Sequence, residues 1–338
     1  EPIIAFQKFH FVDNSDWIYL HKNMRVYANV DMDSEDGLCF RMQSDRSDTV
    51  SLQNINLELI RFRLDKLSGI LPYMPRITGL FSAEANYIQT ATSLQVSAEA
   101  GVEKLTYERQ PVGNIGLGAT WLPGDKGTHY LNAYFRSGDQ EVMTADAVLT
   151  QKNGRDSVEV NTTFEHFPLS LANAFMPDQV VAFTGDIDGG LYISGAMEKP
   201  KLSGDLSLDS VSVYARQAGA RYWFDNRPLK IENNQLIFNK FAIYTTSRNP
   251  FTIDGNVDFR NMDRPTANLT LRAQNYTLLD APRTRESMLY GKIFVDLNAT
   301  VRGPLDGLTM RGNMNLLGNT DVTYVLTDSP LTVEDRLG

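Results

Sequence analysis

The segment Gly291-Lys-Ile-Phe-Val-Asp-Leu-Asn-Ala-Thr-Val301 carries the clearest structural signal in the chain. Apolar side chains occupy every second position from Ile293 to Val301, and polar side chains fill most of the positions between them. Because successive side chains of a strand point to opposite faces, this period of two predicts a β-strand with one apolar face. The same alternation recurs in residues 94–98, 158–164, 251–259, 269–273 and 322–326. We therefore predict an all-β protein.

Turn signals separate these segments at intervals of roughly 8–15 residues. Asn153-Gly154 predicts a two-residue hairpin turn, because both residues tolerate the left-handed backbone that such a turn needs. Helical periodicity is weak, and residues 64–71 and 169–175 predict at most a short helix or turn before a proline. The apolar positions change parity between Leu208 and Val211, which predicts a bulge or a sharp bend.

Three parts of the chain resemble one another. Each contains a glycine followed by an alternating strand, and Gly79, Gly185 and Gly291 are separated by the same 106 residues. We predict approximate repeats over 62–166, 167–275 and 276–338, the last incomplete, within one continuous elongated β segment spanning residues 1–338. Tandem β-sandwiches of about 100 residues are the alternative. The lack of a proline-rich or serine-rich linker between the repeats favours the continuous segment.

Composition excludes several classes of function. The 338 residues include 32 Lys+Arg and 41 Asp+Glu, so the net charge of −9 argues against a nucleic-acid-binding surface. Cys39 is the single cysteine, and the four histidines lack the spacing of metal ligands, so we predict no disulfide, no metal and no cofactor. No apolar run approaches the ~18 residues of a membrane helix. The chain also starts without a signal peptide, and we expect it to be a segment of a larger protein.

Possible catalytic motifs have better structural explanations. Asp31-Met-Asp33-Ser-Glu35-Asp36-Gly37 resembles the start of a calcium loop, but its glycine is one position late and Met42 replaces the final glutamate. The glycines of 113–118 have the wrong spacing for a dinucleotide loop, so we interpret them as strand glycines. No nucleophile elbow or zinc-protease helix motif is present, and we predict that the chain is not an enzyme.

An ordered series of motifs resembles a known family. Gly190-Leu-Tyr-Ile-Ser-Gly195 is followed by Pro200-Lys-Leu-Ser-Gly204-Asp-Leu-Ser-Leu208, and further downstream by Phe251-Thr-Ile253-Asp-Gly255. Over about residues 165–338 this order is similar to the periplasmic repeats of the TamB/AsmA-like family of Gram-negative bacteria. The resemblance implies a curled, elongated sheet, the β-taco, which is an open half-pipe with an apolar interior.

The resemblance also implies a function. TamB-like proteins span the periplasm between the inner and outer membranes. They conduct phospholipid along the half-pipe and affect outer-membrane protein assembly and secretion. The implied partners are phospholipid and, through regions outside this segment, an outer-membrane barrel protein. The implied anchor in the inner membrane also lies outside this segment. Two alternatives remain: an assembly factor that acts by β-strand pairing, and a passive β-rich structural module with a closed core.

A lipid groove needs an uninterrupted apolar lining. Exposing one CH₂ group to water costs about 0.8 kcal/mol, so a ~16-carbon chain faces a barrier of about 12 kcal/mol, or about nine decades in rate. Because apolar contact is non-directional, a lipid can slide along such a lining. The predicted lining residues alternate along the strands of the second half of the chain: Leu206, Leu208, Leu229, Ile231, Phe251, Ile253, Val257, Leu269, Leu271, Ile293, Val295, Leu297 and Val301.

Overall fold

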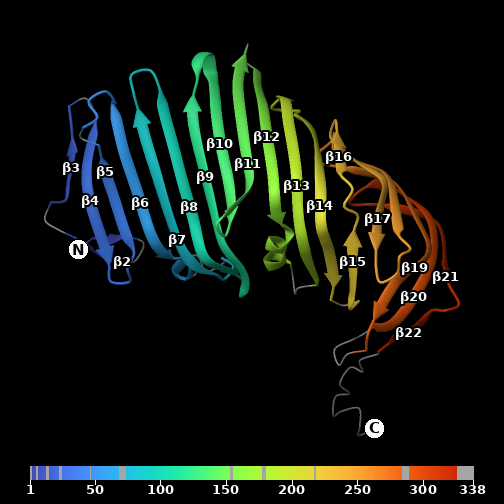
Figure 1. Ribbon diagram of the computed structural model, residues 1–338. Helices are drawn as coiled ribbons and strands as arrows, with labels where there is room; N and C mark the ends of the chain where they lie inside the picture. The colour runs from blue at the N-terminus through green and yellow to red at the C-terminus, as the bar shows by residue number, and fades with distance from the viewer. Residues whose placement is uncertain are drawn as a thin grey trace, which may run out of the picture. The chain divides into compact units, whose positions relative to one another are not determined.

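The computed structural model of the protein describes residues 2–4, 7–12, 15–22, 25–45, 47–67, 74–152, 155–176, 180–216, 218–283 and 289–325. Most of these residues lie in antiparallel β-strands (Figure 1). The chain divides into two compact units. Unit 1 comprises residues 1–174 and 188–202, and unit 2 comprises residues 175–187 and 203–338.

Unit 1 is a sheet of successive strands. Its elements are β1 (Ile3–Ile4), β2 (Gln7–Phe11), β3 (Trp17–Leu20), β4 (Val26–Ser34), β5 (Cys39–Ser44), β6 (Gln53–Arg63), η1 (Leu64–Lys66), β7 (Ile77–Gln89), β8 (Leu94–Tyr107), β9 (Gln110–Pro123), η2 (Asp125–Gly127), β10 (Thr128–Ser137), β11 (Gln140–Lys152), β12 (Arg155–Pro168) and the second part of β13 (Val181–Ala196). From β4 to β12 each strand pairs with the next one in the sequence. Both β2 and β3 pair with β4.

Unit 2 continues the same mode of pairing. It contains the first part of β13, most of β14 (Lys201–Ala215), β15 (Ala220–Phe224), β16 (Leu229–Glu232), β17 (Gln235–Tyr244), β18 (Phe251–Asp258), β19 (Thr266–Ala281), β20 (Leu289–Pro304), β21 (Thr309–Leu316) and β22 (Asp321–Tyr324). The short strands β15 and β16 each pair with both β14 and β17. From β17 to β20 the strands pair in order, and β20 then pairs with β21 and with β22.

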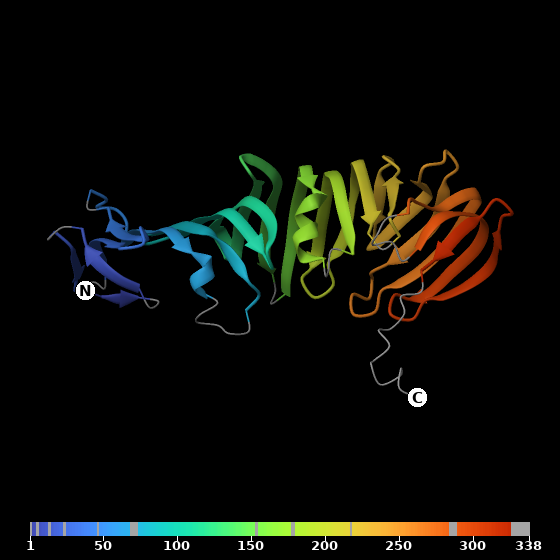
Figure 2. The ribbon, with the colours of Figure 1, turned by 90° about the horizontal axis from the view of Figure 1, so that it is seen from below.

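These pairings confirm the predicted fold class. The chain is an all-β protein whose sheet is built from successive antiparallel strands, and no pairing among the described residues closes it into a barrel. Figure 2 shows the twist of the strands within each unit. The short 3₁₀ helices η1 and η3 (Leu169–Phe175) confirm the two predicted helical turns. Asn153-Gly154 lies outside the described residues, but β11 and β12 on either side pair as a hairpin requires.

Bulges shift the register within several strands. In each of four strands, two consecutive residues face a single residue of the next strand. These bulges lie between Leu59 and Phe62 of β6, between Val102 and Leu105 of β8, between Phe238 and Phe241 of β17, and between Ala273 and Tyr276 of β19. Because a bulge adds one residue, the apolar side chains before and after it stay on the same face of the sheet. Ser210 has φ 52 between the two paired parts of β14, which confirms the break predicted there.

The glycines of the predicted repeats share a backbone conformation. Gly79, Gly185 and Gly291 have φ of 143, 87 and 114, and each lies near the start of a long strand. At Gly291 a Cβ atom would lie 2.2 Å from the carbonyl oxygen of Asp321 on the neighbouring strand, so only glycine fits there. The repeats therefore place their glycines alike, while their boundaries and the single continuous segment stay predictions.

Candidate functional site

One face of the unit 1 sheet is apolar from β4 to β12. Directly opposed residues point to the same face of a sheet, so the strand register identifies this surface. One apolar row runs from strand to strand through Met32, Phe40, Leu59, Ala83, Ala100, Leu117, Phe135, Met143 and Phe164. No charged residue interrupts this row. We call this side of the unit the unit 1 face.

Small residues occupy the middle of the unit 1 face. A parallel row consists of alanine on five successive strands, through Ala85, Ala98, Ala119, Ala133 and Ala145. The next row along the strands contains larger side chains on β7 to β10, at Tyr87, Val96, Trp121 and Leu131, and another alanine, Ala147, on β11. The alanines therefore form a shallow strip, about 19 Å long at 4.8 Å per strand. Larger apolar residues border it on both sides at β9 and β10, whereas Ala83 and Ala100 extend the area of small side chains on β7 and β8.

The unit 1 face is open over much of its area. Leu117 is 53% exposed, Leu57 is 39% exposed and Tyr87 is 37% exposed, although all three point to the apolar side. A contiguous apolar surface of this kind is uncommon on a soluble protein unless it binds something.

At the β2–β7 end, the unit 1 face contains an apolar hollow. Its volume is about 590 Å³, within the usual range of ligand pockets. We call it the phenylalanine hollow, and it is lined by Phe9, Leu38, Phe40, Leu59, Phe62, Leu64, Leu67 and Phe81. A second hollow of about 580 Å³ also borders Phe40 and extends toward Trp17 and Ile18 on β3. Phe9, Val30, Met32 and Leu38 form the buried cluster beneath them.

The thirteen predicted lining residues all lie in unit 2, and the register places them on one face of its sheet. Phe251, Ala273 and Leu297 are direct cross-strand neighbours, as are Leu269 and Val301. Leu206 faces Leu229, and Ile231 connects through Leu236 to Val257. Twelve of the thirteen are half-buried, whereas Val295 is only 2% exposed. We call this surface the unit 2 face.

The unit 2 face packs partly against itself. Tyr276, Val295 and Ala273 form a buried cluster that Phe251, Ile293 and Leu297 border. In a second cluster Ala220 of β15 contacts Leu279 and Ala281 of β19, with Tyr222 beside them. The Tyr222 hydroxyl donates a 2.9 Å hydrogen bond to the carbonyl oxygen of Leu278, and burial raises the pKa of this phenol. Val295 is therefore a packing residue as well as a predicted lining residue.

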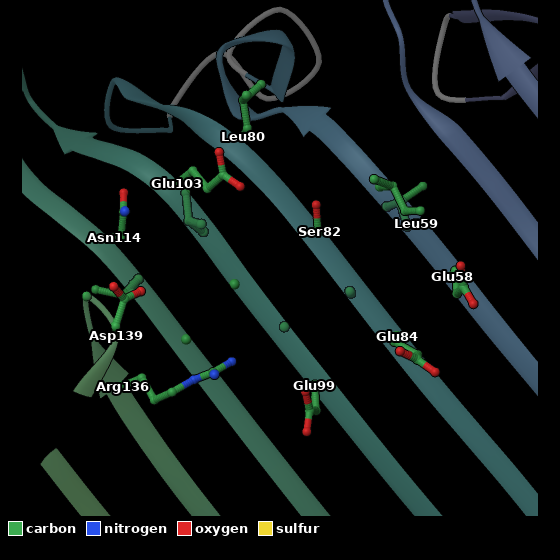
Figure 3. Close-up of a pocket in the computed structure, with 18 residues that line it drawn as sticks. Glu58, Leu59, Leu80, Ser82, Glu84, Glu99, Glu103, Asn114, Arg136 and Asp139 are labelled. Carbon is green, nitrogen blue, oxygen red and sulfur yellow. The ribbon is translucent and has the colours of Figure 1, made fainter. Parts of the chain in front are cut away.

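The opposite face of unit 1 is strongly acidic. Glu58, Glu84 and Glu99 are direct neighbours on β6, β7 and β8, and Figure 3 shows them on successive strands of one pocket. Arg41 is 3.6 Å from Glu58 at one end of this row. At the other end lies Tyr134, and both burial and the Glu99 carboxylate raise the pKa of its phenol. Carboxylates in direct opposition repel one another.

The glycines of β9 make room on this acidic face. A Cβ atom at Gly118 would lie 2.2 Å from the ring of Tyr134, and one at Gly116 would lie 3.3 Å from Nε of Arg136. Tyr134 and Arg136 therefore lie across β9 on the side where Figure 3 shows Arg136 and Glu99. Both glycines belong to a strand, which confirms the interpretation of 113–118 as strand glycines rather than a nucleotide loop.

Comparison with protein families identifies part of the chain. Residues 239–336, which include β18 to β22 and the end of β17, match the family model described as the TamB C-terminal domain. Residues 239–336 are therefore similar to the TamB C-terminal domain. No curated protein and no solved structure matches it. The match lies within unit 2 and contains nine of the thirteen predicted lining residues, from Phe251 onward.

The TamB match supports a general role. TamB proteins are cell-envelope components that act in outer-membrane biogenesis, and they are not a known enzyme family. None of the helices in the described part of the chain has the length and hydropathy needed to cross a bilayer.

The sequence interpretation missed the unit 1 face and the phenylalanine hollow as candidate binding surfaces. Residues 94–98 were recognised as a strand, but they were not connected to 119, 133 and 145 on later strands. An alanine at the facing position of each consecutive strand is the signal that could have found this surface, since hairpins of known length fix the register.

Proposed function

We propose that this TamB-like chain is a periplasmic lipid-conducting scaffold that shields phospholipid acyl chains on its apolar faces. The observation that carries the proposal is the unit 1 face, where one apolar row crosses nine strands without a charged residue and the surface remains partly exposed. A tail on these rows stays out of water, at a saving of about 0.8 kcal/mol per CH₂ group. The headgroup stays in water, and no catalytic residue or cofactor is required.

Each unit contributes differently to this proposed function. The strip of alanines in unit 1 offers a shallow path for one extended acyl chain, and the phenylalanine hollow offers a deeper site at its end. The half-buried residues of the unit 2 face, such as Ile253, Leu269 and Val301, provide a second lining.

Paired substitutions on one strand test the proposal. Leu117→Lys places a charge on the unit 1 face, whereas Thr120→Lys places the same charge on the acidic face of β9. We expect Leu117→Lys to lower the lipid that co-purifies with the protein, measured by mass spectrometry, at least tenfold, and Thr120→Lys to leave it unchanged. Leu269→Lys and Thr270→Lys form the equivalent pair on β19. Equal lipid in all variants, or no lipid in the parent protein, contradicts the proposal.

A second candidate function is strand pairing with a nascent outer-membrane protein. All eight residues of β21 are exposed, and among the described residues β21 pairs only with β20. Its apolar side chains include Met310 and Met314, at 56% and 59% exposure. An unpaired strand edge can accept another strand. If strand pairing is the function, Met314→Pro abolishes binding of an unfolded outer-membrane barrel chain, whereas Leu117→Lys leaves that binding intact.

A further inference from the structure

Six residues within long strands have a left-handed backbone although none is glycine. Arg61, Lys104, His166, Ser210, Lys240 and Asn275 have φ between 45 and 65. Such angles are uncommon outside glycine and need compensation from the surroundings. Arg61, Lys104, Lys240 and Asn275 are each the second added residue of a bulge.

Five of these six residues, all except Ser210, make the same hydrogen bond. In each of the five, the backbone N–H donates to a side-chain oxygen on the next strand, rather than to a backbone carbonyl of the ladder. The pairs are Arg61 to Ser82 Oγ at 3.0 Å, Lys104 to Asn114 Oδ1 at 2.8 Å, His166 to Asp188 Oδ1 at 2.8 Å, Lys240 to Asp254 Oδ1 at 2.8 Å and Asn275 to Asp296 Oδ1 at 2.7 Å. We call the four pairs that lie at a bulge, those of Arg61, Lys104, Lys240 and Asn275, clamped bulges.

The position of each acceptor is systematic. Ser82, Asn114, Asp254 and Asp296 each sit directly opposite the two added residues, between the last ladder pair before the bulge and the first pair after it. A bulge leaves an N–H group without a ladder partner, and a short polar side chain at this place satisfies it. The acceptor is a hydroxyl, an amide or a carboxylate, so acceptor geometry matters more than charge.

The clamped bulges lie within the apolar faces, and a bulge bends the strand that contains it. Phe238 and Phe241 flank the bulge of β17, both point to the unit 2 face, and their rings meet edge to face at 5.8 Å. On β19 the bulge separates Ala273 from Tyr276, yet both pack with Val295 in one buried cluster. Without the extra residue, the apolar side chains after each bulge would point to the polar side.

We propose that the clamped bulges are the conformational device that sets where each strand bends and keeps the apolar side chains on one face. The short acceptor side chain on the next strand holds the left-handed residue in place. Each bend is therefore specified by a residue pair across two strands. This inference concerns the shape of each unit's sheet and holds whether or not the faces bind lipid.

Exchange of single amides tests the clamp directly. Asp254→Ala removes the acceptor of the Lys240 amide, whereas Asp254→Asn keeps an Oδ1 acceptor of the kind that Asn114 already provides. In the full chain we expect hydrogen exchange at the Lys240 amide to accelerate about tenfold in the alanine variant and to change little in the asparagine variant. The Asn275 amide is the internal control, because its acceptor is Asp296.

The bend is measured separately with two spin labels. Glu232 and Arg248 are exposed and lie beyond the two ends of β17. With Cys39→Ser as background, we expect Asp254→Ala to lengthen the distance between labels at 232 and 248 or to broaden its distribution, and Asp254→Asn to preserve both.

If Asp254→Ala unfolds the chain, Ser82→Ala tests the exposed clamp of β6 by hydrogen exchange at the Arg61 amide. Unchanged exchange after loss of the acceptor, or equal effects of alanine and asparagine, overturns the proposal.

Discussion

The two units use the same alternating pattern for surfaces that differ in burial. In unit 1 the central strands oppose alanine to alanine, and Leu117 stays 53% exposed on the apolar side. In unit 2 Tyr276 and Val295, on the corresponding side, are each 2% exposed. Alternation therefore determines which side chains share a face, but not whether that face is covered.

The difference arises from contacts between residues far apart in the sequence. In unit 2, Thr245 Oγ1 donates to the carbonyl oxygen of Thr277 at 2.8 Å, and Tyr222 bonds Leu278 across 56 residues. These bonds hold β19 against β15 and the segment after β17, so that large side chains meet. In the middle of unit 1 the large residues Leu57, Tyr87 and Leu117 on the apolar side stay 39%, 37% and 53% exposed. An open apolar face suits a transient ligand, and a packed one stabilises the unit.

The largest expected effect concerns the packed part of unit 2. Tyr276→Ala removes a buried ring and should lower the free energy of unfolding by about 3–5 kcal/mol. Leu117→Ala in unit 1 removes an exposed side chain and should cost less than about 1 kcal/mol. Urea denaturation followed by tryptophan fluorescence and by circular dichroism measures both. Similar costs for the two variants would contradict the proposed difference in burial.

Enlarging an alanine sharpens the comparison. Ala299 of β20 is 2% exposed, so Ala299→Leu should force neighbouring atoms apart and cost about 1–3 kcal/mol. Ala133 of β10 lies in the open alanine strip, and Ala133→Leu should change the unfolding free energy by less than about 0.5 kcal/mol.

The same pair of variants separates stability from the proposed binding of lipid. A leucine at 133 fills the strip without adding charge, so we expect less co-purified lipid from a fully stable protein. Loss of stability in Ala133→Leu would show that the unit 1 face is covered.

A smaller effect is expected from the acidic face of unit 1. Glu84 lies between Glu58 and Glu99, so Glu84→Gln removes two repulsive neighbours and should stabilise the protein by about 0.2–1 kcal/mol at low salt. The gain should shrink in 1 M salt, because ions screen exposed charges. Glu159→Gln on β12, away from this row, is the control. A gain that is independent of salt would exclude charge repulsion as its cause.

Much of the fold was predictable because strand alternation is local. The segments 251–259 and 269–273 were predicted as strands, and the register opposes them directly in unit 2. Burial was not predictable in the same way. The period of two placed Val295 and Val301 together in the predicted lining. The bulge of β19, however, brings Tyr276 opposite Val295, and the two residues pack in one buried cluster. The alanine strip was missed because alanine is weakly apolar and is not typical of strands.

The smallest expected effect distinguishes the units by pH. In unit 2, hydrogen bonds from the side chain and the backbone N–H of Arg260 lower the pKa of Asp258 to about 2. In unit 1, Ser51 and Asn54 lower the pKa of Asp48, whose own carbonyl oxygen accepts a hydrogen bond from Arg25. A lowered pKa in the folded state means that the ionised carboxylate stabilises the fold. This contribution is complete above the unfolded pKa of about 3.9 and is lost as pH falls toward the folded value.

Thermal unfolding at pH 6, 4 and 2.5 measures these two contributions. At pH 6 the Asp48→Asn and Asp258→Asn variants should each be less stable than the parent protein. Between pH 4 and 2.5 the stability of each variant should fall less than that of the parent protein, because the titrating carboxyl group is gone. The effect of Asp258→Asn should be modest, since Arg260 is 68% exposed and water screens the pair. Asp48→Asn should also loosen the buried Arg25, which hydrogen exchange at residues 48–54 reports. If both variants keep the acid sensitivity of the parent, these two aspartates do not control it in either unit.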